Sequence, residues 1–243
     1  MICIIVLICE YPQALPPYPM HMSLRVGTPT DPLRIAVMIS GSGSGMRALL
    51  EHAERKKDCC HSTVIVLSDR PDAKGLSIGE NYDIPSVGIS LPKGNHDSIS
   101  RRLIHEELVQ SKLIENNVEA IILSGYMRIL SPNFVSKWEG KILNIHPSLL
   151  PKFPGAHAHQ DVISSQETES GCTVHFVDSG MDTGAIIEQS IVPVFPNDTV
   201  ESLQQRVKIE EHKLYPKIID EFSEGKIRLI NGEVISSANR VDN

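Results

Sequence analysis

The chain has no excess of basic residues. Its 23 lysines and arginines are outnumbered by 30 aspartates and glutamates, which gives a formal net charge of −7 at pH 7. Proteins that bind the nucleic-acid backbone normally present a basic face. The composition therefore predicts that nucleic acid is not a partner, although it leaves room for a local basic pocket.

No hydrophobic run is long enough to suggest a membrane span. The apolar run at the start of the chain, Met1–Cys9, is far shorter than the roughly 20 residues needed to cross a bilayer. It also lacks the basic residues that open a secretory signal, and Glu10 follows it instead of a small-residue cleavage site. We therefore expect a cytoplasmic protein with no membrane partner.

Cysteine is scarce, and its spacing is not that of a disulfide framework or a metal site. The number of cysteines, five, is odd, and no C-x-x-C pair occurs, whereas disulfide-rich domains and zinc sites carry paired cysteines at short intervals. The sequence therefore predicts reduced thiols, at Cys3, Cys9, Cys59, Cys60 and Cys172.

The first 33 residues lack the pattern of a folded segment. Residues 11–33 are rich in proline and show no hydrophobic periodicity, so neither a helix nor a strand is predicted there. We predict that 1–33 is a leader outside the fold, with Met20 and Met22 as alternative starting residues. The predicted folded domain is 34–243.

From Arg34 onward, short apolar runs alternate with segments of helical periodicity. Buried strands are predicted at 34–40, 64–68, 84–90, 120–126 and in the first part of Lys141–Pro151. Helices are predicted between them, at 46–56, 74–83, 98–117 and 131–140. The rest of the chain predicts two strands within 171–194, a closing helix at 200–225 and a hairpin at 227–236. The fold class is therefore α/β, with a doubly wound, mostly parallel, Rossmann-like sheet.

A glycine-rich loop separates the first predicted strand from the first predicted helix. Such a loop offers backbone N–H groups and a helix N-terminus to an anion. A dinucleotide site has the spacing G-x-G-x-x-G, but Gly41, Gly43 and Gly45 give G-x-G-x-G. Because the acidic Asp69 ends the next strand, a nicotinamide enzyme stays an alternative. A monophosphate cradle at Gly43, Ser44 and Gly45 is favoured, with a ligand-free tight turn as the simplest alternative.

Asn144 and His146 stand two residues apart at the end of the strand predicted in Lys141–Pro151. Residues at i and i+2 of a strand project from the same face, here at the sheet end where α/β folds bind ligands. Asp182, in a distant glycine-rich turn, is a candidate third member. Such groups can perform acyl transfer, because the amide holds a carbonyl oxygen, the imidazolium moves a proton and the carboxylate favours the protonated ring. A hydrogen-bonded core histidine is the alternative for His146.

Other polar residues have both a functional and a purely structural interpretation. His157, His159 and His175 could suggest a metal, but their spacing matches no zinc motif, so solvated or pocket-lining histidines are favoured and no metal is predicted. Arg102 could hold a carboxylate or lie in solvent. Lys208 and Glu211 could face a phosphate and a hydroxyl, or form one solvated pair on the closing helix. No Gly-x-Ser-x-Gly motif indicates a serine hydrolase.

Five blocks in this order carry a family resemblance: SGSGSGMRALL, LSGYMRILSPNFV, KILNIHPSLLPKFPGAHAHQ, GCTVHFVDSGMDTGAII and RVKIEEHKLYP. They resemble the phosphoribosylglycinamide formyltransferases (GAR transformylases), a family of folate-dependent formyltransferases. The resemblance covers about 34–230 and is similar to the form found as a domain of multifunctional purine-synthesis proteins.

The resemblance implies a reaction and a set of residues. A formyl group would pass from the cosubstrate 10-formyltetrahydrofolate to the amine of glycinamide ribonucleotide (GAR) in de novo purine synthesis, with no metal and no nicotinamide. Asn144 and His146 would stabilise the tetrahedral intermediate, and Asp182 would tune His146 and organise the water that relays the amine proton. It also implies association with other purine-synthesis enzymes.

The resemblance assigns the binding residues as well. Implied folate contacts are Arg102, Met127, Arg128, Ile129, Leu130, Asn144, Asp178, Ser179, Gly180, Met181 and Asp182. Implied GAR contacts are Gly43, Ser44, Gly45, Lys208, Ile209, Glu210 and Glu211. One departure concerns the phosphate loop, since the family usually has Asn-Leu where this chain has Gly45-Met46. Backbone donors survive that change, but a side-chain amide is lost.

Three alternatives differ from this reading. A methionyl-tRNA formyltransferase would normally add an RNA-binding barrel after the closing helix, where only a short segment follows here. A formyltetrahydrofolate hydrolase would carry a regulatory domain before the core, and 1–33 is too short for one. A non-catalytic nucleotide- or folate-binding module would not need Asn144, His146 and Asp182 together.

Overall fold

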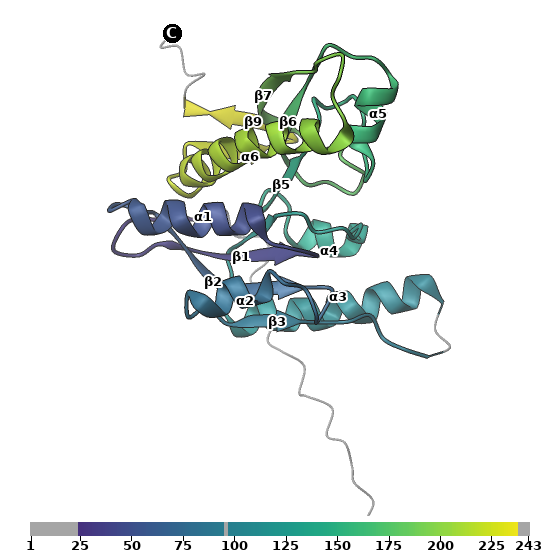
Figure 1. The fold of residues 1–243 in the computed structure, drawn as a ribbon. Helices are drawn as coiled ribbons and strands as arrows, with labels where there is room; N and C mark the ends of the chain where they lie inside the picture. The colour runs from purple at the N-terminus through teal and green to yellow at the C-terminus, as the bar shows by residue number, and fades with distance from the viewer. Residues whose placement is uncertain (1–23, 95–96, 238–243) are drawn as a thin grey trace, which may run out of the picture.

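The computed structural model describes residues 24–94 and 97–237, and Figure 1 shows a twisted sheet with helices on both sides. Seven strands are ordered β3-β2-β1-β4-β5-β6-β7. Five are parallel to one another: β1 Leu33–Ile39, β2 His61–Ser68, β3 Ser86–Gly88, β4 Ala120–Leu123 and β5 Ile142–His146. The last two, β6 Glu169–Phe176 and β7 Ile186–Pro193, are antiparallel. The predicted fold class is confirmed.

The helices follow the predicted order, and all the predicted helices except the first, which begins two residues earlier than predicted, are shorter than predicted. They are α1 Ser44–Arg55, α2 Leu76–Asn81, α3 Ser98–Glu115, α4 Pro132–Lys137, α5 Ala158–Ser164 and α6 Val200–Ser223. Helix α5 was not predicted. The hairpin of β8 Ile227–Ile230 and β9 Glu233–Ser236 is confirmed, and its turn residues Asn231 and Gly232 have φ of 53° and 81°, as an Asn-Gly hairpin turn requires.

Strand β4 is shorter than its apolar run suggested. Its ladder ends at Leu123, and Gly125 adopts a φ of 71°, a left-handed conformation that glycine accepts without strain. The chain therefore leaves the sheet at Ser124. The loop that follows, 124–130, lies beside the carboxyl ends of the neighbouring strands.

Both faces of the sheet are buried, which explains why its strands are almost continuously apolar. In β1, Ile35 and Val37 belong to a core shared with α1 and α6, whereas Ala36 and Met38 belong to a core shared with α3 and α4. The side chains of a strand alternate between faces, so one apolar run supplies two cores. This packing holds the carboxyl ends of β1, β4 and β5 in fixed relative positions.

Helix α6 is tied directly to those strand ends. The Tyr215 hydroxyl lies 2.9 Å from both Leu123 O and Leu143 O, carbonyls at the end of β4 and in the middle of β5. The ring is fully buried, and burial raises the pKa of Tyr215 well above its usual value. The hydroxyl therefore stays protonated and shares its hydrogen between the two carbonyls.

Part of the predicted leader packs on the domain. The Arg25 guanidinium binds Glu119, with Nη2 2.7 Å from Oε2, and Gly27 N donates to Ser223 O over 2.8 Å. Within the described residues, the packed chain therefore begins before the predicted boundary at Arg34. The rest of that leader, 1–23, lies outside the described residues. None of the helices within 24–94 and 97–237 combines the length and the apolar character needed to cross a membrane.

Candidate active site

A cavity of about 630 Å³ opens at the carboxyl ends of β1, β4 and β5. From β1 the chain continues to β2 on one side and later reaches β4 on the other. Loops that leave neighbouring strands in opposite directions create a crevice, and ligands of α/β proteins bind in such crevices. The cavity has the size and position of a small-molecule site.

Most of the predicted site residues meet in this cavity. Its walls include Gly43, Ser44, Gly45, Met127, Arg128, Ile129, Leu130, Asn144, His146, Asp178, Gly180, Met181, Asp182, Lys208 and Glu211. Four predicted residues are not among the lining residues, namely Arg102, Ser179, Ile209 and Glu210. The Ile209 side chain is exposed, and Glu210 binds Lys213 Nζ at 2.7 Å.

His146 is buried, and both of its ring nitrogens face acceptors. Nε2 lies 2.8 Å from the carbonyl oxygen of Phe153, and Nδ1 lies 3.2 Å from Asp182 Oδ2. A carbonyl oxygen only accepts, so Nε2 carries hydrogen. Nδ1 is attracted to the Asp182 carboxylate only when it also carries a hydrogen. The hydrogen on Nδ1 is therefore the one that His146 can donate.

The chain after β5 folds back to hold His146 in place. Pro147 ends the strand as predicted, since it has no N–H for a ladder bond. Ser148 is fully buried, and its hydroxyl lies 2.6 Å from Lys152 O and 3.2 Å from Phe153 O. These bonds close the loop so that the Phe153 carbonyl faces His146 Nε2.

Asp182 is held by backbone on the opposite wall. Its Oδ2 accepts the Gly155 N–H over 2.8 Å in addition to facing His146, and its φ is 55°. A left-handed backbone is uncommon for a non-glycine residue and often marks a functional position. Oδ1 lies 3.8 Å from His175 Nε2, beyond hydrogen-bond distance, so it can accept from a water or an amine.

The Asn144 amide is oriented by His175. His175 Nδ1 lies 2.8 Å from the Phe176 carbonyl, which it must donate to, and Nε2 lies 3.2 Å from Asn144 Nδ2. Burial lowers the pKa of His175, so Nε2 is an unprotonated acceptor for the amide N–H. One hydrogen of the Asn144 amide is used in this bond. The other remains for a ligand oxygen.

The glycine loop leads into α1 with its first N–H groups uncapped. Gly43, at the N-cap, has a φ of 68° and makes no side-chain capping bond. A Cβ there would lie 2.9 Å from Gly75 Cα, so both the dihedral and the contact require glycine. The free N–H groups of the first turn can bind a phosphate.

Gly45 lies against Ser124 at the edge of this loop. A Cβ on Gly45 would lie 2.7 Å from Ser124 Oγ, so the serine hydroxyl fills the space where a side chain would begin. Both residues line the cavity. The Ser124 hydroxyl, from the loop after β4, therefore occupies the place where a side chain at position 45 would begin.

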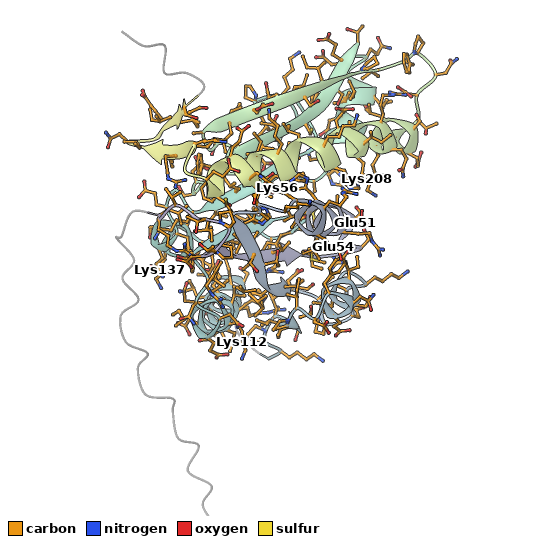
Figure 2. All side chains as sticks on the ribbon, turned by 90° about the vertical axis from the view of Figure 1, so that its left-hand side faces the viewer. Glu51, Glu54, Lys56, Lys112, Lys137 and Lys208 are labelled. Atoms are coloured by element: carbon orange, nitrogen blue, oxygen red, sulfur yellow. The ribbon has the colours of Figure 1, made fainter. Side chains whose placement is uncertain are left out.

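Lys208 and Glu211 complete this end of the cavity from α6. Lys208 projects where α6 faces α1, as the turned view in Figure 2 shows. Burial raises the pKa of Glu211 to about 7, against the opposing effect of Lys208. The two are therefore not a solvated surface pair, because they line the cavity beside the glycine loop.

The cavity also has an apolar rim. Met127, Ile129 and Met181 each expose more than half of their surface there, at 59%, 56% and 51%. Exposed apolar side chains beside a cavity favour a flat or apolar ligand group. The lining of this one cavity thus includes anion-binding groups, exposed apolar side chains and the set Asn144, His146 and Asp182.

The predicted histidine cluster does not form a metal site. Within 24–94 and 97–237, groups of three metal-type ligands converge elsewhere, and His157, His159 and His175 do not meet at one point. His159 and His175 line the cavity, as the pocket-lining interpretation predicts. The sequence did not predict that His175 orients Asn144. It also did not predict that the Phe153 carbonyl faces His146 or that Ser124 lies against Gly45. Antiparallel pairing of β5 with β6 places Asn144 opposite His175, and this register cannot be deduced from residue spacing.

Comparison with known proteins gives consistent results. A family model described as formyl transferase matches residues 33–219. A trifunctional purine biosynthetic protein adenosine-3 from Chironomus tentans is 48% identical over 197 residues, 81% of this chain but 14% of that protein. The phosphoribosylglycinamide formyltransferase of Haemophilus influenzae is 39% identical, over 81% of this chain and 90% of that protein. The solved glycinamide ribonucleotide transformylase 1 of Symbiobacterium toebii has a TM-score of 0.77 at 35% identity and covers 84% of this chain and 94% of that one.

Proposed function

The chain belongs to the formyl transferase family, and from that premise we propose that it transfers a formyl group from 10-formyltetrahydrofolate to the amine of GAR. The observation that carries the proposal is that one cavity is lined by the glycine loop, by Asn144, His146 and Asp182, and by exposed apolar side chains. A formyl transfer to a phosphorylated amine requires those three regions.

Asn144 holds the formyl oxygen in this proposal. Its amide is anchored to His175 through one N–H, so the second N–H is preorganised for an oxygen on which negative charge develops. Preorganised donors of this kind commonly contribute about 10²–10³ in rate. His175 acts through Asn144 and is a positioning residue.

His146 supplies a proton, and Asp182 sets the orientation of the ring. The proton on Nδ1 faces both Asp182 and the cavity, whereas Nε2 is committed to Phe153 O. Asp182 Oδ1 has no hydrogen-bond donor among the described residues, so it is free to organise the water that takes a proton from the attacking amine. General acid–base catalysis of this kind contributes about 10²–10⁴ in rate.

The GAR phosphate binds the glycine loop. The uncapped N–H groups at the start of α1 and the Lys208 ammonium supply donors and positive charge. Glu211 contacts a hydroxyl of the ribose, and Ile209 and Glu210 support this part of α6. Gly45 contributes through its backbone.

The exposed apolar residues that line the cavity suit the flat ring of the folate. Its pterin would lie along Met127–Leu130, 178–182 and Asn144, with Ser179 at the rim, and Arg102 would meet its glutamate tail. When bound, the folate supplies the activated formyl group. The rim residues Met127, Ile129 and Met181 would keep water from the flat ring.

We further propose that the chain acts in cytoplasmic purine synthesis beside other enzymes of that pathway. The support is that relatives named trifunctional purine biosynthetic protein contain the matching region within a longer chain. This chain spans 14% of the length of those two relatives.

The test is a substrate comparison with the full chain. 10-Formyltetrahydrofolate is supplied with GAR, with methionyl-tRNA or with buffer alone, and formylated product and released tetrahydrofolate are both measured. The proposal expects formyl-GAR and tetrahydrofolate in equal amounts, and background product in the other two reactions. Product with methionyl-tRNA, or tetrahydrofolate released without GAR, would replace the proposal by one of the two rival activities.

A further inference from the structure

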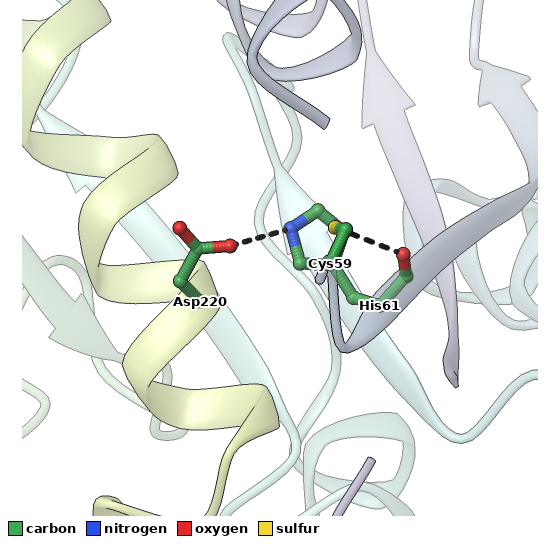
Figure 3. Close-up of side chains that lie close together, drawn as sticks. All are labelled: Cys59, His61 and Asp220. Atoms are coloured by element: carbon green, nitrogen blue, oxygen red, sulfur yellow. Dashed lines mark hydrogen bonds and ion pairs between the residues drawn. The ribbon is translucent and has the colours of Figure 1, made fainter. Parts of the chain in front are cut away.

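A second cluster of reactive side chains lies at the amino end of β2, at the opposite end of the strands from the cavity. Cys59 and His61 stand where β2 begins, and Asp220 faces them from α6, as Figure 3 shows. One ligand atom from each of the three lies within 4.8 Å of the others. Asp220 is twelve residues beyond Lys208 on α6, about 18 Å along a helix, so the cluster is separate from the cavity.

His61 is the unusual member of this cluster. Its side chain is fully buried, and neither Nδ1 nor Nε2 has a hydrogen-bond partner among the described residues. Asp220 Oδ1 likewise lacks one. Buried polar atoms are nearly always satisfied, and the exceptions call for an explanation such as an ion.

The geometry between His61 and Asp220 suggests that their facing atoms bind the same ion. Nε2 lies 3.2 Å from Oδ1, the ion-pair contact drawn in Figure 3, yet the two atoms do not meet hydrogen-bond geometry. At metal–ligand distances near 2.0–2.1 Å, two ligands of a tetrahedral zinc ion are about 3.3 Å apart, and their lone pairs point at the ion instead of at each other. An ion bound by both side chains would explain both the short distance between the two atoms and their poor hydrogen-bond alignment.

The rest of Asp220 is already oriented for such a role. Its other oxygen, Oδ2, lies 2.7 Å from His52 Nε2 and 3.0 Å from Lys56 Nζ. Outer hydrogen bonds of this kind fix ligating carboxylates in metal sites. Lys56 also binds Glu224 Oε1 at 3.0 Å, so part of its charge is balanced away from the cluster.

Cys59 supplies the third ligand and an opening to solvent. It is half-buried, and its Sγ lies 3.3 Å from the carbonyl oxygen of His61. Because Cys59 is only half-buried, water can take a fourth coordination position.

We propose that Cys59, His61 and Asp220 form a binding site for a divalent ion of the zinc class, completed by a water molecule. Thiolate, imidazole and carboxylate together select Zn²⁺ over Mg²⁺ or Ca²⁺. Binding releases the thiol proton of Cys59 and requires neutral His61. The ion joins the start of β2 to α6 and thereby cross-links two elements that are far apart in the sequence.

The test uses the full chain, stripped with a chelator and titrated with Co²⁺ as a spectroscopic probe. The proposal expects one tightly bound ion per chain, visible d–d bands of tetrahedral Co²⁺ and a sulfur-to-metal charge-transfer band in the near ultraviolet. Cys59→Ser should abolish the charge-transfer band. Asp220→Asn should weaken binding by roughly tenfold or more, since even outer-shell changes have effects of that size.

Matched controls separate this site from the active-site histidines and from unfolding. Cys60→Ala removes a neighbouring buried thiol whose Sγ bonds to Asp58 O, and it should keep the full spectrum. Added Zn²⁺ should raise the melting temperature of the wild type and of Cys60→Ala, but not of Cys59→Ser. A charge-transfer band that survives in Cys59→Ser, or a wild type with no such band, would overturn the proposal.

Discussion

The reacting groups of the candidate site owe their orientation to neighbours that do not react. His146 is fixed through the carbonyl of Phe153, and Asn144 is fixed through His175. In each case a buried donor has one partner within the protein, so the remaining hydrogen has a defined direction. Preorganisation of this kind contributes to catalysis because little reorganisation is needed as charge develops.

The pairing of Gly45 with Ser124 makes a prediction about the phosphate loop. Gly45→Asn should raise KM for GAR, because its Cβ would lie 2.7 Å from Ser124 Oγ and force the serine hydroxyl to rotate away from the phosphate loop. Ser124→Ala should also raise KM for GAR if its hydroxyl reaches the phosphate. In the double variant, the increase in the free energy that corresponds to KM for GAR should be smaller than the sum of the two single increases. KM for the folate should stay unchanged in the two single variants and in the double variant.

A double-mutant cycle measures that coupling. Residues in contact typically show interaction free energies of about 0.5–3 kcal/mol. Additive effects on KM for GAR would show that position 45 and Ser124 act independently. They would also remove the proposal that the hydroxyl compensates for the missing amide.

Glu211 predicts a pH dependence of GAR binding. Burial raises its pKa to about 7, so its carboxylate fraction rises about tenfold between pH 6 and pH 8. If the carboxylate accepts from a ribose hydroxyl, KM for GAR should fall over this range in the wild type. The GAR phosphate titrates at the lower end of this range, near pH 6, and the Glu211→Gln variant retains only that contribution. Identical profiles in the two proteins would contradict the role.

Among the elements, α6 links the two halves of the site. It carries Lys208 and Glu211 on one side of the cavity, and Tyr215 binds the carbonyls of Leu123 and Leu143. These carbonyls belong to β4 and β5, whose ends carry Ser124 and Asn144. A shift of α6 would therefore alter the phosphate end and the catalytic end together.

Tyr215→Phe is the direct test of this link. The ring volume is kept, but two carbonyls lose a shared buried donor, which should lower the free energy of unfolding by about 1–2 kcal/mol. Urea unfolding should show a lower midpoint with an unchanged m-value. An unchanged midpoint would mean that the hydroxyl contributes nothing to holding α6 on the sheet.

The sequence predicted the elements better than their pairing. Apolar runs and helical periodicity indicated β1 to β5 and the long helices, because burial on both sheet faces leaves a strong pattern. Helix α5 escaped prediction, since His159, Gln160 and Asp161 interrupt the apolar pattern of its seven residues. The ends of β3 and β4 depend on turns such as the one at Gly125, which tertiary packing decides.

At the scale of the whole molecule, the N-terminal segment joins distant parts of the chain. Arg25 binds Glu119, which precedes β4, and Gly27 binds Ser223, which ends α6. Glu119 also accepts the backbone N–H of Arg34 over 2.8 Å. The proline content of 11–33 gave no sign of these contacts, because they depend on partners about ninety residues or more away.

Shortened chains test the contribution of this segment. A chain that begins at Arg34 should be less stable than one that begins at Leu24, by on the order of 3 kcal/mol or more, because it loses the Arg25 and Gly27 bonds and the buried Leu33 side chain. The partly exposed Arg25–Glu119 pair supplies only a small part of this. Equal melting temperatures would support the boundary predicted from the sequence.

The central claim is that Asn144, His146 and Asp182 carry formyl transfer to GAR. Its most direct test is the single-turnover rate of formyl transfer with both substrates saturating, in the wild type and in His146→Ala. We expect a loss of more than about 100-fold, with folate affinity nearly unchanged. A variant that transfers the formyl group at the wild-type rate would contradict the account.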